Sequence, residues 1–69
     1  MGLSNKTLID TNANGYTYYG EALAGTATSA AEWQISRKGT SGTVDTYVYA
    51  NGKDSFVNIW DNRTSLTYL

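Results

Sequence analysis

The chain has no cysteine and no histidine, so neither a disulfide bond nor any of the usual zinc sites can hold its fold together. It has only 69 residues, and a domain of that size buries about 60% of the surface that its unfolded chain exposes. Such small domains usually need a cross-link, a metal or a partner subunit. We therefore expect a single domain over residues 1–69, stabilised by other chains or by a hard cation bound to oxygen atoms.

The charge of the chain limits the partners that this domain can have. Five basic and six acidic residues give a net charge of −1, and the only adjacent basic pair is Arg37 and Lys38, whereas nucleic-acid binders carry a basic stripe. The apolar stretches are too short for a membrane anchor, and residues 1–5 lack the charged and apolar regions of a secretory signal. We expect a soluble protein, or part of a soluble assembly, without a nucleic-acid or membrane partner.

The composition favours β-structure. Aromatic residues make up 13% of the chain, with six tyrosines and two tryptophans, and charged residues make up only 16%. Tyrosine, tryptophan and threonine suit a half-buried, pleated surface. The sequence therefore predicts an all-β fold, with a small antiparallel sheet of four to five short strands and one short C-terminal helix.

Alternating side chains and turn residues divide the chain into these strands. Two Asn-Gly pairs, at residues 14–15 and 51–52, are strong hairpin turns, and a third turn is expected at residues 39–42. The predicted strands cover residues 6–10, 16–22, 33–38, 43–50 and 64–69.

Two segments show helical patterns. The capping box from Ser29 to Glu32 predicts one helical turn. Phe56, Ile59, Trp60 and Arg63 fall at i, i+3, i+4 and i+7, which predicts a helix over residues 55–62 that packs on the sheet. The expected core consists of Leu8, Trp33, Ile35, Val44, Val48, Phe56, Ile59, Trp60 and Leu66.

One motif has the form of a calcium loop. Asp10, Asn12, Asn14, Gly15 and Glu21 fit the spacing of an EF-hand loop. An EF-hand needs a helix on each side, however, and residues 16–19 favour a strand, so the same residues are expected to form a β-hairpin turn in which Asn and Gly adopt positive φ. We expect no metal site here. A calcium site formed by Asp10, Asn12, Asn14 and Glu21 is the weak alternative.

The acidic residues give no indication of an active site. No spacing singles out two of them for acid–base chemistry, histidine and cysteine catalysis is excluded, and a chain of this length has little room for a deep pocket. We expect no enzymatic activity and no cofactor. The six carboxylates are Asp10, Glu21, Glu32, Asp45, Asp54 and Asp61.

The tyrosines are the candidate contact residues. Tyr16 and Tyr18 share one face of their predicted strand, and Tyr47 and Tyr49 share one face of theirs. A tyrosine-rich surface with few charges is typical of a protein interface, and the same rings could also stack on sugars. Arg63 is added as a contact residue because it can pair with a carboxylate or stack on an aromatic ring.

The C-terminal segment Phe56-x-x-Ile59-Trp60-Asp61-Asn62-Arg63-x-Ser65-Leu66-x-Tyr68 resembles the ends of small proteins encoded by tailed bacteriophages and prophages. The stretch from Gly25 to Ile35, the Tyr18-Tyr19-Gly20 strand and the Ala50-Asn51-Gly52 turn resemble the same group. The similarity spans roughly residues 16 to 68, and it implies a virion or tail-associated structural component without catalytic residues.

Residues and resemblance together predict a structural protein of the virion, such as a decoration, fibre, collar or tail component. It would act by forming a homo-oligomer or by docking on other virion proteins, because symmetric copies reuse one surface many times. The alternative is a module that recognises the host surface by binding glycans through its exposed tyrosine and tryptophan rings.

Overall fold

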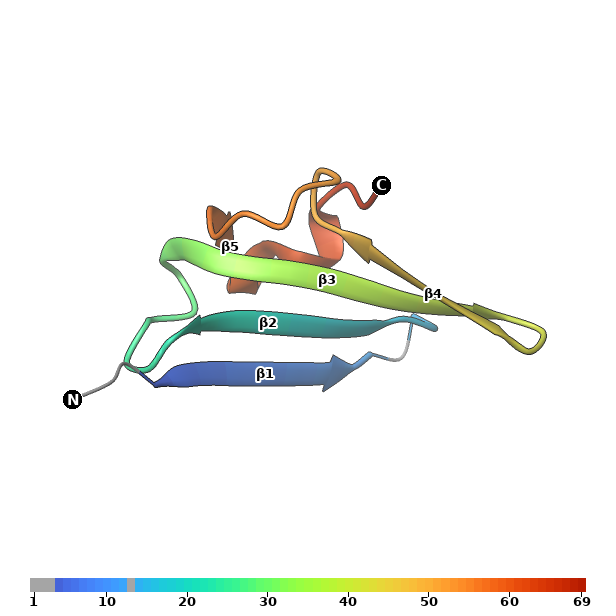
Figure 1. The fold of residues 1–69 in the computed structure, drawn as a ribbon, viewed down its shortest axis with the longest axis horizontal. Helices are drawn as coiled ribbons and strands as arrows, with labels where there is room; N and C mark the ends of the chain where they lie inside the picture. Colours follow the sequence, from blue (N-terminus) through green and yellow to red (C-terminus); the bar gives the residue numbers. More distant parts are fainter. Residues whose placement is uncertain (1–3, 13) are drawn as a thin grey trace.

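The computed structural model describes residues 4–12 and 14–69. Residues 1–3, where no secretory signal is expected, and Ala13 of the first predicted turn lie outside the described residues. Along the described chain, strands β1 (Asn5–Thr11), β2 (Thr17–Leu23), β3 (Ala31–Ser41), β4 (Val44–Tyr49) and β5 (Asn58–Ile59) are followed by the 3-10 helix η1 (Trp60–Ser65). The predicted all-β class is confirmed (Figure 1).

The strands form one antiparallel meander in the order β1-β2-β3-β4, and β5 pairs with β3. Leu8 of β1 lies opposite Gly20 of β2, which in turn lies opposite Ile35 of β3. On the other side of β3, Arg37 lies opposite Val48 of β4. Since residues that lie directly opposite in antiparallel strands point to the same face, this register decides which side chains can meet.

The two Asn-Gly turns form as their sequences predict, whereas the turn expected at residues 39–42 lies at residues 42–43, because β3 extends to Ser41. Gly15 has a φ of 92° between β1 and β2, and the amide of Asn12 donates to the carbonyl of Tyr16 to close that hairpin. After β4, Asn51 and Gly52 have φ values of 58° and 69°. Positive φ at both central positions is what a type I′ turn requires, and Asn-Gly is the pair that adopts it with least strain.

Both predicted helical segments are wrong in detail. The segment predicted as a helical turn, residues 29–32, is divided between a turn at residues 28–30 and the start of β3 at Ala31. Residues 55–62 contain the β5 strand and the start of η1 instead of an α-helix. Two turns of α-helix have little stability of their own, and here the backbone of Asn58 pairs with Trp33 instead. The short C-terminal helix is thus present, but it is a 3-10 helix over Trp60–Ser65.

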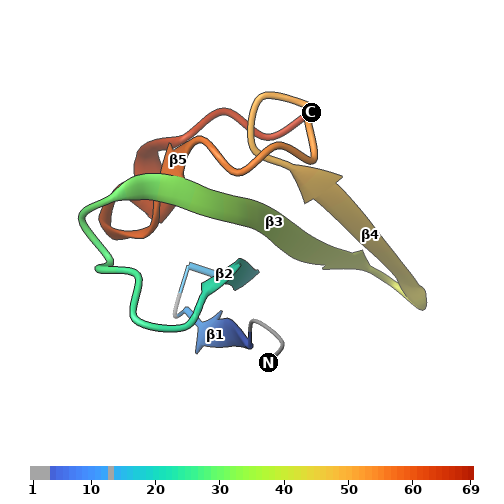
Figure 2. The same cartoon turned by 60° about the vertical axis from the view of Figure 1, so that its left-hand side comes forward.

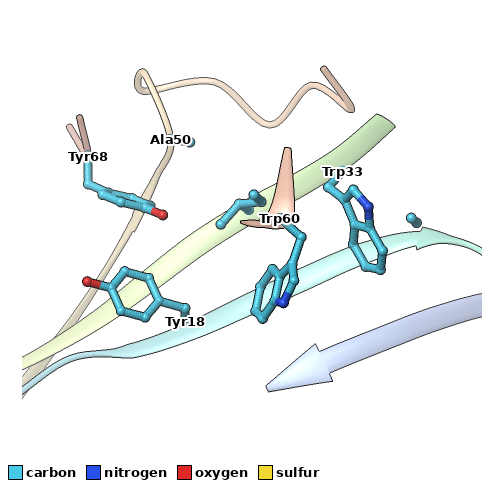
Figure 3. Packing of buried hydrophobic residues seen from close by; sticks show 7 residues of the cluster. Tyr18, Trp33, Ala50, Trp60 and Tyr68 are labelled. Atoms are coloured by element: carbon cyan, nitrogen blue, oxygen red, sulfur yellow. The ribbon is translucent and has the colours of Figure 1, made fainter. Parts of the chain in front are cut away.

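The core lies between one face of the sheet and the C-terminal segment that follows β4. The Trp33 and Trp60 rings lie 5.9 Å apart between centroids, and those of Tyr18 and Tyr68 lie 5.8 Å apart (Figure 3). The Trp33 indole N–H donates to the carbonyl of Ala27 at 2.9 Å, so its polar atom remains bonded. The buried residues are Tyr18, Ala22, Trp33, Ile35, Ala50, Trp60 and Tyr68.

The predicted core is right at its centre and wrong at its margins. Trp33, Ile35 and Trp60 are buried, and Leu8, Val48 and Leu66 pack partly against them. Val44 and Phe56 were expected inside, but they are 61% and 53% exposed, and Ile59 is only partly buried. Val44 lies near the tip of the β3–β4 hairpin, beyond the reach of the C-terminal segment, and Phe56 lies in the loop before β5.

The molecule is elongated. The β3–β4 hairpin extends past the ends of β1 and β2 as an arm (Figures 1 and 2), and the overall dimensions are 44 × 23 × 22 Å. The radius of gyration is 12.3 Å, compared with about 11 Å for a compact chain of this length. No helix in residues 4–12 and 14–69 is long and apolar enough to cross a membrane.

Gly20 is expected to tolerate no side chain. A Cβ atom at this position would lie 2.5 Å from Cε3 of Trp60 and 3.1 Å from Cε3 of Trp33, both in the core. Gly20→Ala should therefore lower the free energy of unfolding by about 1 to 3 kcal/mol, as overpacking of a core does, measured by urea denaturation. Gly39→Ala is the matched control, since its Cβ would meet the ring of Tyr16, an exposed side chain that can move. Equal losses in the two variants would contradict this account.

Candidate interaction surface

The sheet has one covered face and one uncovered face. Tyr18, Gly20 and Ala22 of β2 point to the covered face, where Trp60 and Tyr68 lie. The alternate residues point to the opposite side, which no part of the described chain covers. We call this side the open face, and it consists of Asn5, Thr7, Ile9, Thr11, Thr17, Tyr19, Glu21, Leu23, Gln34, Ser36, Lys38, Thr40, Asp45, Tyr47 and Tyr49.

Apolar side chains cross the open face from one edge of the sheet to the other. Ile9, Tyr19, Ser36 and Tyr49 lie opposite one another in consecutive strands. The ring of Tyr47 lies 6.0 Å from that of Tyr19, between centroids. Ile9 is 63% and Tyr47 is 59% exposed. An apolar band of this kind on one sheet is a recognised mark of an interaction surface.

Only part of this band was predicted from the sequence. Tyr47 and Tyr49, which were predicted as contact residues, lie on the open face. Ile9 and Tyr19 lie on it too, but they were not predicted. A signal for them exists, because a hairpin closed by Asn14-Gly15 brings residues 9 and 19 opposite each other. That pairing would have placed both residues on the same face as Tyr49.

The other predicted contact residues lie on the covered side of the sheet. Tyr18 is only 2% exposed, so it belongs to the core and is not a surface contact, contrary to the sequence-based expectation. Tyr16 remains at the surface, where its ring packs against the guanidinium of Arg37 at 4.0 Å. The ring of Tyr68 lies 4.7 Å from the same guanidinium. Arg37 is thus held between two rings, and cation–π contacts stabilise its charge there.

Arg63 joins the C-terminal segment to the first strand. Its Nε donates to Oδ2 of Asp10 at 2.9 Å, and its guanidinium lies 4.6 Å from the Trp60 ring. This hydrogen bond holds the pKa of Asp10 below its ordinary value of 3.8, and a hydrogen bond from Asn12 acts in the same direction. Arg63 thus pairs with a carboxylate and stacks on an aromatic ring within its own chain, and its predicted role as a contact residue at an interface stays a prediction.

The residues of the calcium-loop motif do not converge on one point. Asp10 lies opposite Tyr18, and Glu21 lies opposite Thr7, so the two carboxylates point to opposite faces of the sheet. The side-chain oxygens of Asn12 and Asn14 accept the amides of Asn14 and Tyr16, as turn residues do. In residues 4–12 and 14–69, no three acidic side chains are grouped closely enough to hold a metal ion.

A hollow of about 300 Å³ lies at one end of the open face. It is lined by Asn5, Leu23, Thr26, Glu32 and Phe56, and Glu32 is its one carboxylate. Leu23 and Phe56 are both more than half exposed there. The apolar character of the open face therefore continues into this hollow.

Calcium is expected to have no effect on stability, because the carboxylates of Asp10 and Glu21 lie on opposite faces of the sheet. The melting temperature, followed by circular dichroism, should be the same in millimolar calcium and in excess chelator. The Glu21→Gln variant should behave identically in both solutions. A calcium-dependent increase that Glu21→Gln abolishes would contradict the geometry described above.

Tyr68 should make stability fall in alkaline solution. Burial raises its pKa to about 12, and the nearby Tyr18 acts in the same direction. Since the unfolded chain loses this proton near pH 10, the stabilisation is complete below pH 10 and is lost as the pH rises towards 12. Urea denaturation across this range should show the loss, and Tyr68→Phe should flatten it. Tyr68→Phe should also lower stability at pH 7 by about 1 kcal/mol, because the Tyr68 hydroxyl donates to the carbonyl of Arg63 at 2.7 Å.

The matched control for this pH profile is Tyr47→Phe, since the Tyr47 ring is 59% exposed. Its alkaline profile should follow that of the unaltered protein. An alkaline loss of stability that persists in full in Tyr68→Phe would show that another group causes it.

No family model, no curated protein and no solved structure matches this chain. Its function therefore has to be inferred from its own structure, above all from the open face and the arm of the sheet.

Proposed function

We propose that this protein is a non-enzymatic structural component of a bacteriophage virion that assembles with copies of itself. The observation that carries the assembly role is the open face. There Ile9 of β1 and Tyr47 and Tyr49 of β4 are exposed, and Tyr19 of β2 and Ser36 of β3 lie between them. The virion assignment rests on the sequence resemblance of residues 16 to 68 to small phage structural proteins.

The physical argument for assembly is independent of that resemblance. The core of the described chain contains seven buried hydrophobic residues, and the accessible surface is 4511 Å², slightly above the roughly 4,200 Å² expected for a globular chain of this mass. Fully burying a large apolar side chain, such as Ile9 of the open face, stabilises a complex by about 1.5 to 3 kcal/mol. A second copy on the open face would therefore add substantially to the few kcal/mol that so small a core provides.

The polar residues of the open face do not oppose such contact. Thr7, Thr11, Thr17 and Ser36 are small and uncharged, and they surround the aromatic rings without blocking them. Lys38 and Glu21 bring one charge of each sign to the central strands of the face, and Asp45, which accepts a hydrogen bond from Thr40, lies on the same face towards the tip of the arm. A surface with both signs can oppose a copy of itself without net repulsion.

Light scattering over a dilution series tests this proposal. The unaltered protein should have a mass that is a multiple of 7.5 kDa at high concentration and should dissociate on dilution. Tyr47→Thr should raise the dissociation constant at least tenfold, since a loss of about 1.4 kcal/mol corresponds to that factor. Val44→Thr is the matched control, because Val44 is equally exposed on the same arm but points away from the open face.

A protein that stays folded and monomeric up to hundreds of micromolar would contradict self-assembly. It would favour the second candidate, glycan recognition, for which the exposed ring of Tyr47 beside Tyr19 offers a stacking platform. Binding of the monomer to a glycan array, lost in Tyr47→Thr but kept in Val44→Thr, would support that candidate.

A further inference from the structure

The outer edge of β1 is the longest unpaired strand edge in the described part of the chain. β1 ends the sheet order, and Figure 1 shows no other segment beyond it. The other end of the sheet is partly closed, because the carbonyl of Tyr49 accepts the amides of Gly52 and Leu69, and Ala50 bridges to Tyr68. β1 runs over seven residues and contains no proline, so each of its residues keeps the N–H that pairing with a further strand needs, and Lys6 and Asp10 are its only charged residues.

The hydrogen bonds of the β1–β2 hairpin show which backbone groups face outwards. The amide of Ala24 donates to the carbonyl of Ser4, and the amide of Asn12 donates to the carbonyl of Tyr16. Both contacts join directly opposed residues, and such hydrogen-bonded pairs alternate along an antiparallel ladder. The even-numbered residues of β1 therefore bond to β2. The N–H and C=O groups that point away from the sheet belong to Asn5, Thr7, Ile9 and Thr11.

We propose that two copies of this chain pair their β1 strands antiparallel, edge to edge, around a twofold axis at Leu8. In this register Asn5 lies opposite Thr11 of the second copy, and Thr7 lies opposite Ile9 of the second copy. All four outward-facing residues then exchange both of their backbone hydrogen bonds. Leu8 lies opposite Leu8, at a position between hydrogen-bonded pairs, where side chains approach most closely.

Charge selects this register over its neighbours. With the axis at Leu8, Lys6 of each copy lies directly opposite Asp10 of the other, on the same face of the combined sheet. Within its own chain Lys6 donates to the carbonyl of Thr26 and Asp10 accepts from Arg63, so the pair between copies adds to these contacts. Opposite charges at such positions stabilise strand pairing, and like charges oppose it. Shifting the axis to Thr7 or Ile9 keeps the hydrogen-bond pattern, but it leaves fewer residues paired and separates Lys6 from Asp10. The strand is thus complementary to itself in one register.

This inference rests on the proposed function, because it names how the copies associate. A twofold axis perpendicular to the sheet leaves both open faces on the same side of one continuous, eight-stranded sheet. The two apolar bands would then meet at Ile9 of each copy and form one surface of twice the width. Edge pairing and contact through the open face are therefore compatible, and they can be tested separately.

Cross-linking through introduced cysteines tests the register directly. The chain has no native cysteine, so any disulfide in a single-cysteine variant joins two chains. Leu8→Cys places two thiols opposite each other, at a Cα separation of about 4.5 to 5.5 Å that a disulfide bridges. Mild oxidation should convert most of the protein to a covalent dimer. Thr7→Cys should not cross-link, because its two copies lie beyond the limit of about 7 Å.

Charge and backbone variants provide a second readout in the reduced protein. Lys6→Glu puts like charges opposite each other twice and should raise the dimer dissociation constant at least tenfold, whereas Lys53→Glu, with the same change in net charge, should not. Lys6→Gln loses the same contacts to Thr26 and Trp33 without adding repulsion, so it should raise the dissociation constant less than Lys6→Glu does. Thr7→Pro removes an outward-facing N–H without touching the β1–β2 ladder and should also abolish pairing. Thr7→Val, which keeps that N–H, should still pair.

The outcomes separate this inference from the proposed function. An oligomer by light scattering whose Leu8→Cys variant does not cross-link would overturn the β1 register and leave self-assembly standing. Cross-linking of Thr7→Cys in place of Leu8→Cys would show a different axis and would also overturn it. Leu8→Cys dimers with no effect of Tyr47→Thr would support edge pairing and count against contact through the open face. A monomer that does not cross-link would overturn both.

Discussion

The contact between the Trp60 ring and Gly20 is the one on which the rest of the structure depends. Gly20 sits at the centre of the sheet, with Leu8 on one side and Ile35 on the other. Because it has no side chain, the indole of Trp60 lies directly against the β2 backbone and beside Trp33. This contact holds the segment after β4 on one face of the sheet. The same segment carries Tyr68 to Tyr18 and Arg63 to Asp10.

The first four strands and the Asn-Gly turns were predictable because their determinants are local, whereas the strand expected over residues 64–69 was wrong: η1 runs to Ser65, and only Tyr68 forms a bridge, to Ala50. Asn-Gly pairs adopt positive φ in almost any context, and side chains alternate along a strand whatever covers it. The helix predicted over residues 55–62 was wrong because its pattern has two separate causes. Ile59 belongs to a strand that pairs with Ala31, and Trp60 and Arg63 belong to a 3-10 helix. Spacing alone could not separate these causes, since the pairing partner is distant in the sequence.

The face that becomes covered could not be predicted from β2 alone. This strand carries a tyrosine on each side, Tyr18 on one and Tyr19 on the other, so its pattern is apolar in both directions. The choice is made by the C-terminal segment, about 40 to 50 residues further along the chain. For the same reason the sequence indicated tyrosines as contact residues but included Tyr18, which is buried, and omitted Tyr19. The kinds of group that Arg63 contacts, a carboxylate and an aromatic ring, were predictable from guanidinium chemistry, but Asp10 as the carboxylate was not, because it lies 53 residues away in the sequence.

The arm formed by β3 and β4 is stabilised differently from the rest of the sheet. Beyond Arg37 and Val48 its strands contact mainly each other, and Val44 and Tyr47 are exposed on its two sides. A two-stranded ribbon without a hydrophobic face to cover it is only marginally stable in water. Backbone amides near its tip should therefore exchange with solvent through local opening, whereas those around Ile35 exchange only when the whole domain unfolds. The centre of the sheet is thus rigid, whereas the tip of the arm can change shape. A partner that binds the tip would also order the arm.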